Sequence, residues 1–292
     1  MSRGGELAVA RSGKYLKPEQ RDFLVVQAVA RKQISPGFVR VTLGGPALRG
    51  FTPLGYDQWF RLFLPGERGL RLPKRTGGLW VAEYMLMSKD TRPVGRNYTV
   101  RAHREQGVHS DGPEIDVDFA LHEDAEGGLG PASAWARDGA EGDEAGILDE
   151  GITFLPPSTA RHHLLVGDET ALPAIAGILR SAGGSGGGTR GESQAASAGG
   201  GVPVHAYIEI PHEDDIQPLD APEGSTVHWV TRKSGAACGD GVLAEVKAAD
   251  LPDGPGYAWV AGGRRLATEV RRHLVGERGF PKDSVTFTGY WR

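Results

Sequence analysis

The chain has 292 residues, including 44 glycines and 19 prolines, and a formal net charge of -4. This length suits two domains that each bury a core, and the glycines and prolines predict many turns between short strands. The small charge gives no sign of a nucleic-acid-binding surface, and no apolar run approaches the ~20 residues of a membrane span. The single cysteine, Cys238, excludes an internal disulfide or a cysteine-ligated cluster. With no signal-peptide pattern, we expect a cytoplasmic protein whose redox chemistry depends on a bound organic cofactor.

The first part of the chain predicts a β-meander. Residues 1–19 are polar without a clear period, and we interpret them as a tail or a short lead-in. Short β-branched runs at 23–29 and 38–43 are separated by a Ser-Pro-Gly turn, which is typical between two strands. A third strand at 58–64 carries Arg61 among apolar neighbours. A strand cation whose charge reaches water is one interpretation of this arginine.

The stretch 96–101, Arg-Asn-Tyr-Thr-Val-Arg, predicts a strand that follows a Pro-Val-Gly turn. The alternation of a strand puts Arg96, Tyr98 and Val100 on one face. A guanidinium gives a planar fork of donors for a phosphate, and a flat phenol can lie against a planar heterocycle. These are the needs of a flavin nucleotide. An amphipathic strand with a solvated arginine explains the six residues equally well when they are taken alone.

Two further elements follow this strand. Residues 115–122 alternate apolar and polar side chains, which predicts a half-buried strand. A glycine-rich turn at 127–130 then leads into a helix with Ser133 in its first turn. The backbone N–H groups at a helix start are unpaired and form a ready site for a phosphate. A plain N-cap is the alternative, and the position one strand after 96–101 favours the phosphate site.

The run 164–175 indicates a second domain. A buried apolar strand passes through a turn directly into an apolar helix that extends to about Arg180, which is how a βα unit of a parallel sheet begins. Asp168 and Glu169 lie at the start of the helix, and we expect Glu169 to complement the helix dipole there. This turn lacks the Gly-x-Gly-x-x-Gly fingerprint, so it does not predict a conventional dinucleotide site.

The remaining sequence repeats the βα pattern after an interruption. Residues 181–201 contain nine glycines and four serines, which predicts a flexible loop. Strands and helices then alternate up to a final strand at 284–288. That strand brings Tyr290 and Trp291 to the carboxyl edge of the sheet, where ligands bind in open α/β sheets. Packing of the two aromatic side chains on their own domain is the alternative.

Six motifs in this order resemble the siderophore-interacting proteins, a family of flavin-containing ferric-siderophore reductases. The motifs are Arg-x-Tyr-Thr-Val-Arg at 96–101, Asp-Phe-Ala-Leu-His at 118–122, Gly-Pro-Ala-Ser-x-Trp-Ala at 130–136, Val-Gly-Asp-Glu-Thr-Ala-Leu-Pro-Ala at 166–174, Tyr-Ala-Trp-Val-Ala-Gly at 257–262 and the terminal Gly-Tyr-Trp-Arg. The resemblance implies a two-domain fold of the ferredoxin-reductase superfamily. A six-stranded antiparallel flavin-binding β-barrel at 20–158 would precede an open α/β sheet of the NAD(P)-binding type at 159–292.

The same resemblance implies roles for individual residues toward FAD. Arg96 would bind the phosphate region, Tyr98 and Thr99 would contact the isoalloxazine, and His122 would lie near the adenine. The expected cofactor-binding set is Arg96, Asn97, Tyr98, Thr99, Asp118, Ala120, His122, Gly130, Pro131, Ala132, Ser133, Asp168, Thr170, Ala171, Tyr290 and Trp291. Residues 130–133 would hold the pyrophosphate, residues 168–170 would line the cleft between the domains, and the terminal aromatic pair would shield the flavin.

For the substrate, the resemblance implies a basic patch that attracts an anionic ferric siderophore. Arg61 occupies the strand where the family often has a lysine, and Arg292 follows the terminal aromatic pair. A monomer with no nucleic acid partner and no catalytic acid or base is expected, with NADH, NADPH or a ferredoxin as the electron donor. Two alternatives stay open: an NAD(P)H-dependent reductase of free flavin or of a protein partner, and a ferric-siderophore binding protein without catalysis.

Overall fold

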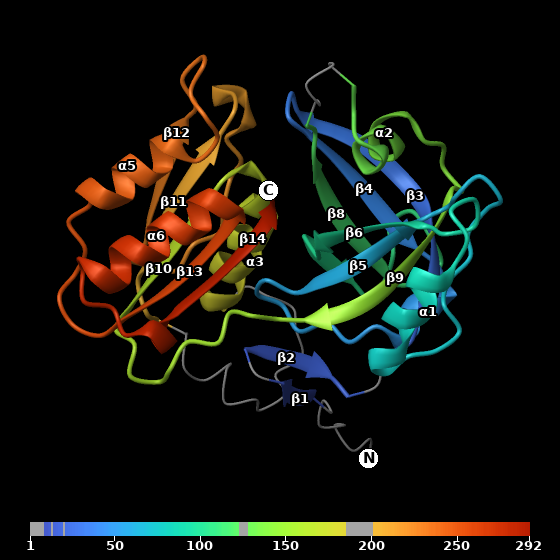
Figure 1. The fold of residues 1–292 in the computed structure, drawn as a ribbon, viewed down its shortest axis with the longest axis horizontal. Coiled ribbons are helices and arrows are strands. Elements are labelled where there is room, and N and C mark those ends of the chain that lie inside the picture. Colours follow the sequence, from blue (N-terminus) through green and yellow to red (C-terminus); the bar gives the residue numbers. More distant parts are fainter. Residues whose placement is uncertain (1–8, 13, 20, 123–127, 185–200) are drawn as a thin grey trace.

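A computed structural model of the chain contains two units that lie side by side (Figure 1). The structure describes residues 9–12, 14–19, 21–122, 128–184 and 201–292. One unit is an antiparallel sheet that curves into a barrel, and the other is a parallel sheet with helices on both faces. No helix in these described ranges is long and apolar enough to cross a membrane.

The elements follow the chain in a regular order. The strands are β1 (Val9–Ser12), β2 (Tyr15–Pro18), β3 (Leu24–Ser35), β4 (Phe38–Gly44), β5 (Trp59–Leu64), β6 (Val94–Thr99), β7 (Ala102–Arg104), β8 (Glu114–Ala120), β9 (Glu144–Gly151), β10 (His162–Gly167), β11 (Val204–Ile210), β12 (Thr226–Thr231), β13 (Gly256–Gly263) and β14 (Val285–Trp291). The helices are α1 (Trp80–Leu86), α2 (Pro131–Asp138), α3 (Leu172–Ala182), α5 (Asp240–Ala248) and α6 (Arg264–Gly276). Short 3-10 turns are η1 (Pro46–Gly50), η2 (Gly77–Leu79), η3 (Glu169–Ala171), η4 (Glu213–Asp215) and η5 (Lys282–Ser284).

The antiparallel sheet has seven strands in the order β6-β5-β9-β3-β4-β8-β7. Its inner face carries one apolar core built from alternate residues of these strands, for example Phe60 and Leu62 of β5. The two ends of the sheet lie close together, because only residues 100 and 101 separate β6 at one end from β7 at the other. The Val100 N–H donates to the Gln58 carbonyl beside β5, and the Arg101 N–H donates to the Asp116 carbonyl of β8, each at 2.8 Å. The predicted antiparallel barrel is therefore confirmed, with one strand more than the six expected. The additional strand is β7, which has three residues.

The interpretation of β8 as half-buried is wrong. Six of its seven residues are buried, although Glu114, Asp116 and Asp118 alternate with apolar side chains. Arg104 donates to the carboxylates of both Glu114 and Asp116, at 2.9 and 2.6 Å. Pairing of this kind lets a polar strand face be covered, because each buried charge has a partner. The alternation in the sequence therefore correctly separated an apolar and a polar face of β8, but both faces are buried.

Residues 9–12 and 15–18, expected within a tail or lead-in, instead form two paired strands. β1 and β2 pair antiparallel, and Leu16 exchanges backbone hydrogen bonds with Ile152 just after β9. Lys17 adds an ion pair with Glu150 of β9 at 2.5 Å. The polar composition of this segment concealed the two strands, because their stability comes from pairing with distant residues and not from an apolar period of their own.

The second sheet has five parallel strands in the order β12-β11-β10-β13-β14. α3 covers the face toward the barrel, and α5 and α6 cover the outer face (Figure 1). In α6, Leu266, Val270 and Leu274 recur every four residues and are buried against the outer face. The predicted open α/β sheet is confirmed.

The predicted loop at 181–201 starts two residues too early, because residues 181 and 182 belong to a helix. α3 extends to Ala182, and the Ser181 hydroxyl accepts a hydrogen bond from the Tyr56 N–H at 2.8 Å. Serine is a moderate helix former, and a partner on the barrel adds to its stability in the last turn of α3. The rest of the predicted loop falls mainly on residues 185–200, which lie outside the described residues.

The two units share a polar seam around Asp57. Its carboxylate, 2% exposed, accepts hydrogen bonds from the Thr153 hydroxyl and N–H, from the Phe154 N–H and from Trp259 Nε1. Trp259 lies on β13 of the parallel sheet, whereas the other partners lie on the barrel side. Because the carboxylate joins both units, it fixes how the carboxyl edge of the parallel sheet faces the barrel.

Candidate functional site

A row of aromatic rings brings three of the predicted motifs together. The ring of Tyr98 on β6 lies 4.2 Å from that of Phe119 on β8, and Phe119 lies 5.9 Å from Trp135 on α2. Burial raises the pKa of Tyr98, so its hydroxyl stays neutral and can donate a hydrogen bond. The stretches 96–101, 118–122 and 130–136 therefore meet in one part of the barrel, where the partly buried Tyr98 and Trp135 pack on either side of the fully buried Phe119.

Arg96 lies on the same strand as Tyr98, and its hydrogen-bond donors are largely free. It is exposed, and its guanidinium donates to the neighbouring Gly95 carbonyl at 2.8 Å, with no ion pair to a carboxylate among the described residues. In the β5–β6 register Arg96 lies opposite Leu62, and Tyr98 lies opposite Phe60. Alternation thus places Arg96 and Tyr98 on the same face, as predicted.

The start of α2 opens beside the aromatic row. Gly130 is the N-cap and Pro131 is the first helical residue, and within the described ranges no side chain is bonded to the first turn. A Cβ atom added at Gly130 would meet no other atom within 4 Å. Ser133 is buried, and its hydroxyl donates to the Ala120 carbonyl at 3.4 Å, which ties the helix to the end of β8. No side chain of the described residues therefore caps the first-turn N–H groups.

Other members of the predicted set have internal partners. Asp118 is buried and accepts two hydrogen bonds from Arg40, at 2.6 and 2.8 Å, and lies 3.3 Å from Arg101. Thr99 is buried opposite Trp59. Asn97 accepts from Arg61 at 3.3 Å on the other face of the β5–β6 pair. The carboxylate of Asp118 thus supports the barrel wall, since its charge is already balanced.

Asp168 ties together the carboxyl ends of three strands. It follows β10, is fully buried, and accepts from the N–H and hydroxyl of Thr170 at 3.0 and 2.5 Å. Its other oxygen accepts from the Gly263 N–H at 2.6 Å and from Trp291 Nε1 at 3.2 Å. Asp168 is the residue that caps η3, and Ala171 behind it is fully buried. Asp168 therefore joins the ends of β10, β13 and β14.

The terminal aromatic pair lies at the same edge. β14 continues to Trp291, with a bulge that pairs Gly262 with Gly289 and Gly263 with Trp291. A Cβ atom at Gly263 would come within 2.9 Å of the Trp291 indole, so the absence of a side chain there seats the ring. Tyr290 and Trp291 remain 41% and 40% exposed.

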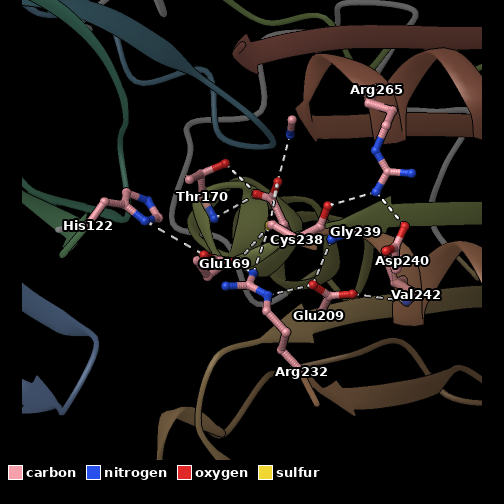
Figure 2. A network of polar contacts seen from close by, with 12 residues as sticks. His122, Glu169, Thr170, Glu209, Arg232, Cys238, Gly239, Asp240, Val242 and Arg265 are labelled. Carbon is pink, nitrogen blue, oxygen red and sulfur yellow. Dashed lines mark hydrogen bonds and ion pairs between the residues drawn. The ribbon is translucent and has the colours of Figure 1, made fainter. Parts of the chain in front are cut away.

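Glu169 lies in the first turn of η3, where its charge suits the helix dipole as expected. It is also buried and pairs with Arg232, which donates to Glu209 at 2.8 Å as well (Figure 2). Arg232 further donates to the sulfur of Cys238 at 2.8 Å. Burial, followed by the charges of Glu169 and Asp168, raises the pKa of the Cys238 thiol. From the barrel side, His122 reaches to 3.7 Å from Glu169.

Oxygen and sulfur atoms of Asp168, Glu169 and Cys238 lie within 4.8 Å of one another. Such a group could resemble a metal site. However, the guanidinium of Arg232 already donates to two of these three residues and balances their charge. A neutral thiol is also a poor metal ligand. The cation at this position is therefore Arg232 itself, and these residues do not favour a metal.

The two basic residues expected to contact substrate lie apart from Arg96. Arg61 points to the outer face of β5, where it pairs with Glu150 at 3.0 Å and lies over the rings of Trp59 and Trp80. Lys17 and Arg21 pair with the same carboxylate at 2.5 and 2.8 Å. Three cations around one buried acid leave a net positive patch. Arg292, the last residue, is exposed.

A cavity of about 550 Å³ lies elsewhere on the barrel and shares none of the predicted site residues. It is lined by Leu48, Arg49, Phe51, Pro53, His103 and the turn 105–113. Phe51 and His103 stack with ring centres 6.0 Å apart, and burial lowers the pKa of His103. Nothing in its lining connects it to the aromatic row.

The sequence analysis missed Arg232, Glu209, Lys17 and Arg21. Arg232 and Glu209 each carry a signal, since Glu209 lies near the end of β11 and Arg232 directly follows β12 on the ligand edge. The ion pairs of Arg232 with Glu169 and Glu209 could not be inferred, because the three residues come from segments far apart in the sequence. Lys17 and Arg21 lie in a stretch without an apolar period, where no signal exists.

Comparisons with known proteins cover both units. Residues 27–153 match the siderophore-interacting FAD-binding domain, and residues 160–292 match the siderophore-interacting protein family. The ferric vibriobactin reductase ViuB of Vibrio cholerae is 27% identical over 90% of this chain and 87% of its own. An NADPH-dependent ferric-chelate reductase of Escherichia coli is 25% identical, over 89% of each chain.

Solved structures agree with these matches. The structure of a siderophore utilization protein from T. fusca superposes with a TM-score of 0.68, at 27% identity and 93% coverage of both chains. Ferredoxin reductases at 13 to 17% identity share the two-domain fold alone. The matched family models cover the barrel and the parallel sheet in the order that the fold requires. The chain belongs to the siderophore-interacting protein family and contains its FAD-binding domain.

Proposed function

We propose that this protein is an FAD-dependent reductase of ferric siderophores that releases Fe(II). The observation that carries the proposal is the surface formed by Arg96, Tyr98 and the start of α2, which offers a free guanidinium, a neutral phenol and open backbone donors side by side. The proposal is supported by similarity to a ferric vibriobactin reductase and to a ferric-chelate reductase.

The residues fit FAD in their donor chemistry. Arg96 and the first-turn N–H groups of α2 are two separate groups suited to phosphate oxygens, which favours a dinucleotide over FMN. Tyr98 offers a half-buried ring and a hydroxyl for the isoalloxazine. We assign His122 from the barrel side, and Thr170, Tyr290 and Trp291 from the parallel-sheet side, to the same cofactor. Asp168 acts through them, because it holds Thr170 and Trp291 in place.

FAD supplies the electron chemistry when bound, accepting two electrons from a donor and passing them singly to iron. The protein needs no acid or base on the metal. Siderophores bind the hard Fe(III) ion far more tightly than Fe(II), so reduction loosens the chelate. Tyr98 and Trp291 exclude water from the faces that they cover, and the barrel residues fix the orientation of the cofactor.

We assign the attraction of an anionic chelate to the net positive patch of Lys17, Arg21 and Arg61 around Glu150, with Arg292 as a second contribution. The patch lies on the outer face of β5 and β9, across the strand pair from Arg96. Charge in this position raises the local concentration of an anionic substrate over a screening length of about 8 Å at physiological salt.

We further infer NADPH or NADH as the donor, with a ferredoxin as the other possible source, and a monomer acting in the cytoplasm. The relative from Escherichia coli is named as NADPH-dependent. A chain with a single cysteine suits a reducing compartment.

The test is anaerobic stopped-flow reduction of the FAD-loaded protein by each donor, followed by mixing with a ferric tris-catecholate and a Fe(II)-specific dye. We expect flavin absorbance to bleach with one donor and to return as the dye reports Fe(II). If the flavin band returns only when free flavin or a protein acceptor is added, and no Fe(II) forms from the ferric chelate, the result would support a general flavin reductase. A colourless preparation that binds the ferric chelate would support a binding protein.

A further inference from the structure

The solvent-facing side of α1 is apolar. This helix lies on the outer side of the barrel (Figure 1). The exposed side chains of α1 and its N-cap are Leu79, Val81, Ala82, Met85 and Leu86. Leu86 is 87% exposed and Met85 is 63% exposed. A surface helix ordinarily presents charged and polar side chains to water on this face, so α1 reverses the usual pattern.

The outer apolar side chains are not needed by the core. Trp80 and Tyr84, four residues apart, share the inner face of α1 and pack edge-to-face on Phe63 at 5.8 and 5.9 Å. Val81 and Met85 have the same spacing on the outer face, as do Ala82 and Leu86. The inner face therefore attaches the helix to the barrel, and the outer face is left without a protein neighbour among the described residues.

The surroundings of α1 are basic. Its one acidic residue, Glu83, accepts hydrogen bonds at its carboxylate from the N–H groups of Lys74 and Arg75, in the segment before the helix, at 3.0 Å each. The side chains of Lys74, Arg75 and Lys89 are exposed. Between residues 67 and 92 there are six basic and three acidic residues, a local excess of three positive charges in a chain of net charge -4.

We propose that α1 with its basic flanks is a docking surface for an anionic lipid bilayer. The apolar arc enters the boundary between headgroups and acyl chains, and Lys74, Arg75 and Lys89 remain at the headgroups. The aromatic side chains that usually anchor protein interfaces are turned inward here, and those exposed are aliphatic or thioether groups. The helix has seven residues and lies along the membrane without crossing it. Binding places the reductase at the membrane surface.

The test is co-sedimentation of the FAD-loaded full chain with sucrose-loaded vesicles. Vesicles of phosphatidylcholine with about one third phosphatidylglycerol should bind the protein, and pure phosphatidylcholine should not. Added salt should release it. The double variant Met85→Ser/Leu86→Ser should lower the partition coefficient about tenfold. Val108→Ser, at a side chain 75% exposed on another surface, is the matched control and should bind like the native chain. Flavin content and Tm of each variant establish that it is folded.

Three results would overturn the proposal: no binding to anionic vesicles, equal binding to neutral ones, or equal loss in the Val108→Ser control. Light scattering provides a fourth. A concentration-dependent dimer that disappears in Met85→Ser/Leu86→Ser would assign the face to a second copy of the chain, and not to a membrane.

Discussion

Two arginines lie in the two regions where a cofactor was expected, and the structure uses them differently. Arg96 on the barrel is exposed and donates to one backbone carbonyl. Arg232 on the parallel sheet has a side chain only 19% exposed and pairs with Glu169 and Glu209, which are nearly or fully buried. A cation with free donors is available to a ligand, whereas a cation that balances two buried acids is part of the fold. The barrel edge is therefore the open half of the site.

The largest expected effect comes from removing Arg232. Arg232→Ala leaves Glu169 and Glu209 buried without a counter-charge, which should lower the free energy of unfolding by about 3–5 kcal/mol. Urea denaturation measures this loss. Arg265→Ala is the control, since Arg265 pairs with Asp240 at the surface and both are about half exposed. That variant should change stability by less than about 1 kcal/mol. Similar losses in both variants would mean that the buried network is not what holds this edge.

A second prediction concerns the opposite edge of the same sheet, where a buried group has no partner. Neither ring nitrogen of His163 has a hydrogen-bond partner in the described structure, and burial lowers its pKa from 6.5 to about 4. Between these values the unfolded chain binds a proton that the native chain does not. Stability should therefore fall by up to roughly 3 kcal/mol as pH drops from 6.5 to 4.

The variant His163→Phe should remove this part of the pH dependence, because the ring lies between Phe154 and Tyr257 and an aromatic replacement fills the same space. Urea unfolding at several pH values measures the slope. His212→Gln, at an exposed position, should leave the slope unchanged. An unaltered slope in His163→Phe would assign the acid sensitivity to another group.

A third prediction concerns Arg96 on the barrel, whose removal should weaken cofactor binding without unfolding the protein. Arg96→Ala should weaken FAD binding by about ten- to a hundredfold, as expected for charge-assisted hydrogen bonds of about 1.5–3 kcal/mol. The Tm of the cofactor-free protein should stay the same, because Arg96 has no buried partner. Flavin titration by fluorescence measures the affinity. Lys89→Ala is a control at another exposed cation. An Arg96→Ala protein that stays fully yellow on purification would contradict the assignment.

Much of this contrast could be predicted from sequence on the barrel side. The period of two in 96–101 correctly placed Arg96 and Tyr98 on one face, since strand alternation depends only on local geometry. The βα pattern at 164–175 correctly indicated the parallel sheet for the same reason.

The parallel-sheet edge could not be predicted in the same way. Glu169 was expected only to complement a helix dipole, because its neighbours in the chain start a helix, and its ion-pair partner Arg232 lies 63 residues away. Likewise, the burial of Asp116 depends on Arg104 from another strand. Ion pairs between distant residues leave no period in the sequence, so a paired charge and a free one look alike until the strands are placed.

The patch around Glu150 is intermediate between these two cases, because Arg61 is paired but its surroundings remain net positive. Arg61→Gln should raise the KM for an anionic ferric siderophore on the order of threefold, and added salt should reduce the difference. A neutral quinone acceptor should react at an unchanged rate. Steady-state kinetics at two salt concentrations measure both. Equal changes for both acceptors would place the substrate elsewhere and leave Arg61 as a structural residue of β5.

The smallest effect on stability and FAD content is expected from shortening the segment 185–200, to which no ion pair and no ligand contact is assigned. The segment 185–200 consists mainly of glycine, serine and small or polar residues, a composition that offers little apolar surface for burial. Replacing it by Gly-Ser-Gly-Ser shortens the segment to about a quarter of its length. Each halving of a loop changes the free energy of loop closure by only about 0.6 kcal/mol. Stability should therefore change by about 1 kcal/mol or less, and FAD content should match that of the native chain. Differential scanning calorimetry and the flavin-to-protein absorbance ratio measure the two quantities. A loss of several kcal/mol would show that the segment packs against the core, and a loss of FAD alone would place it at the cofactor.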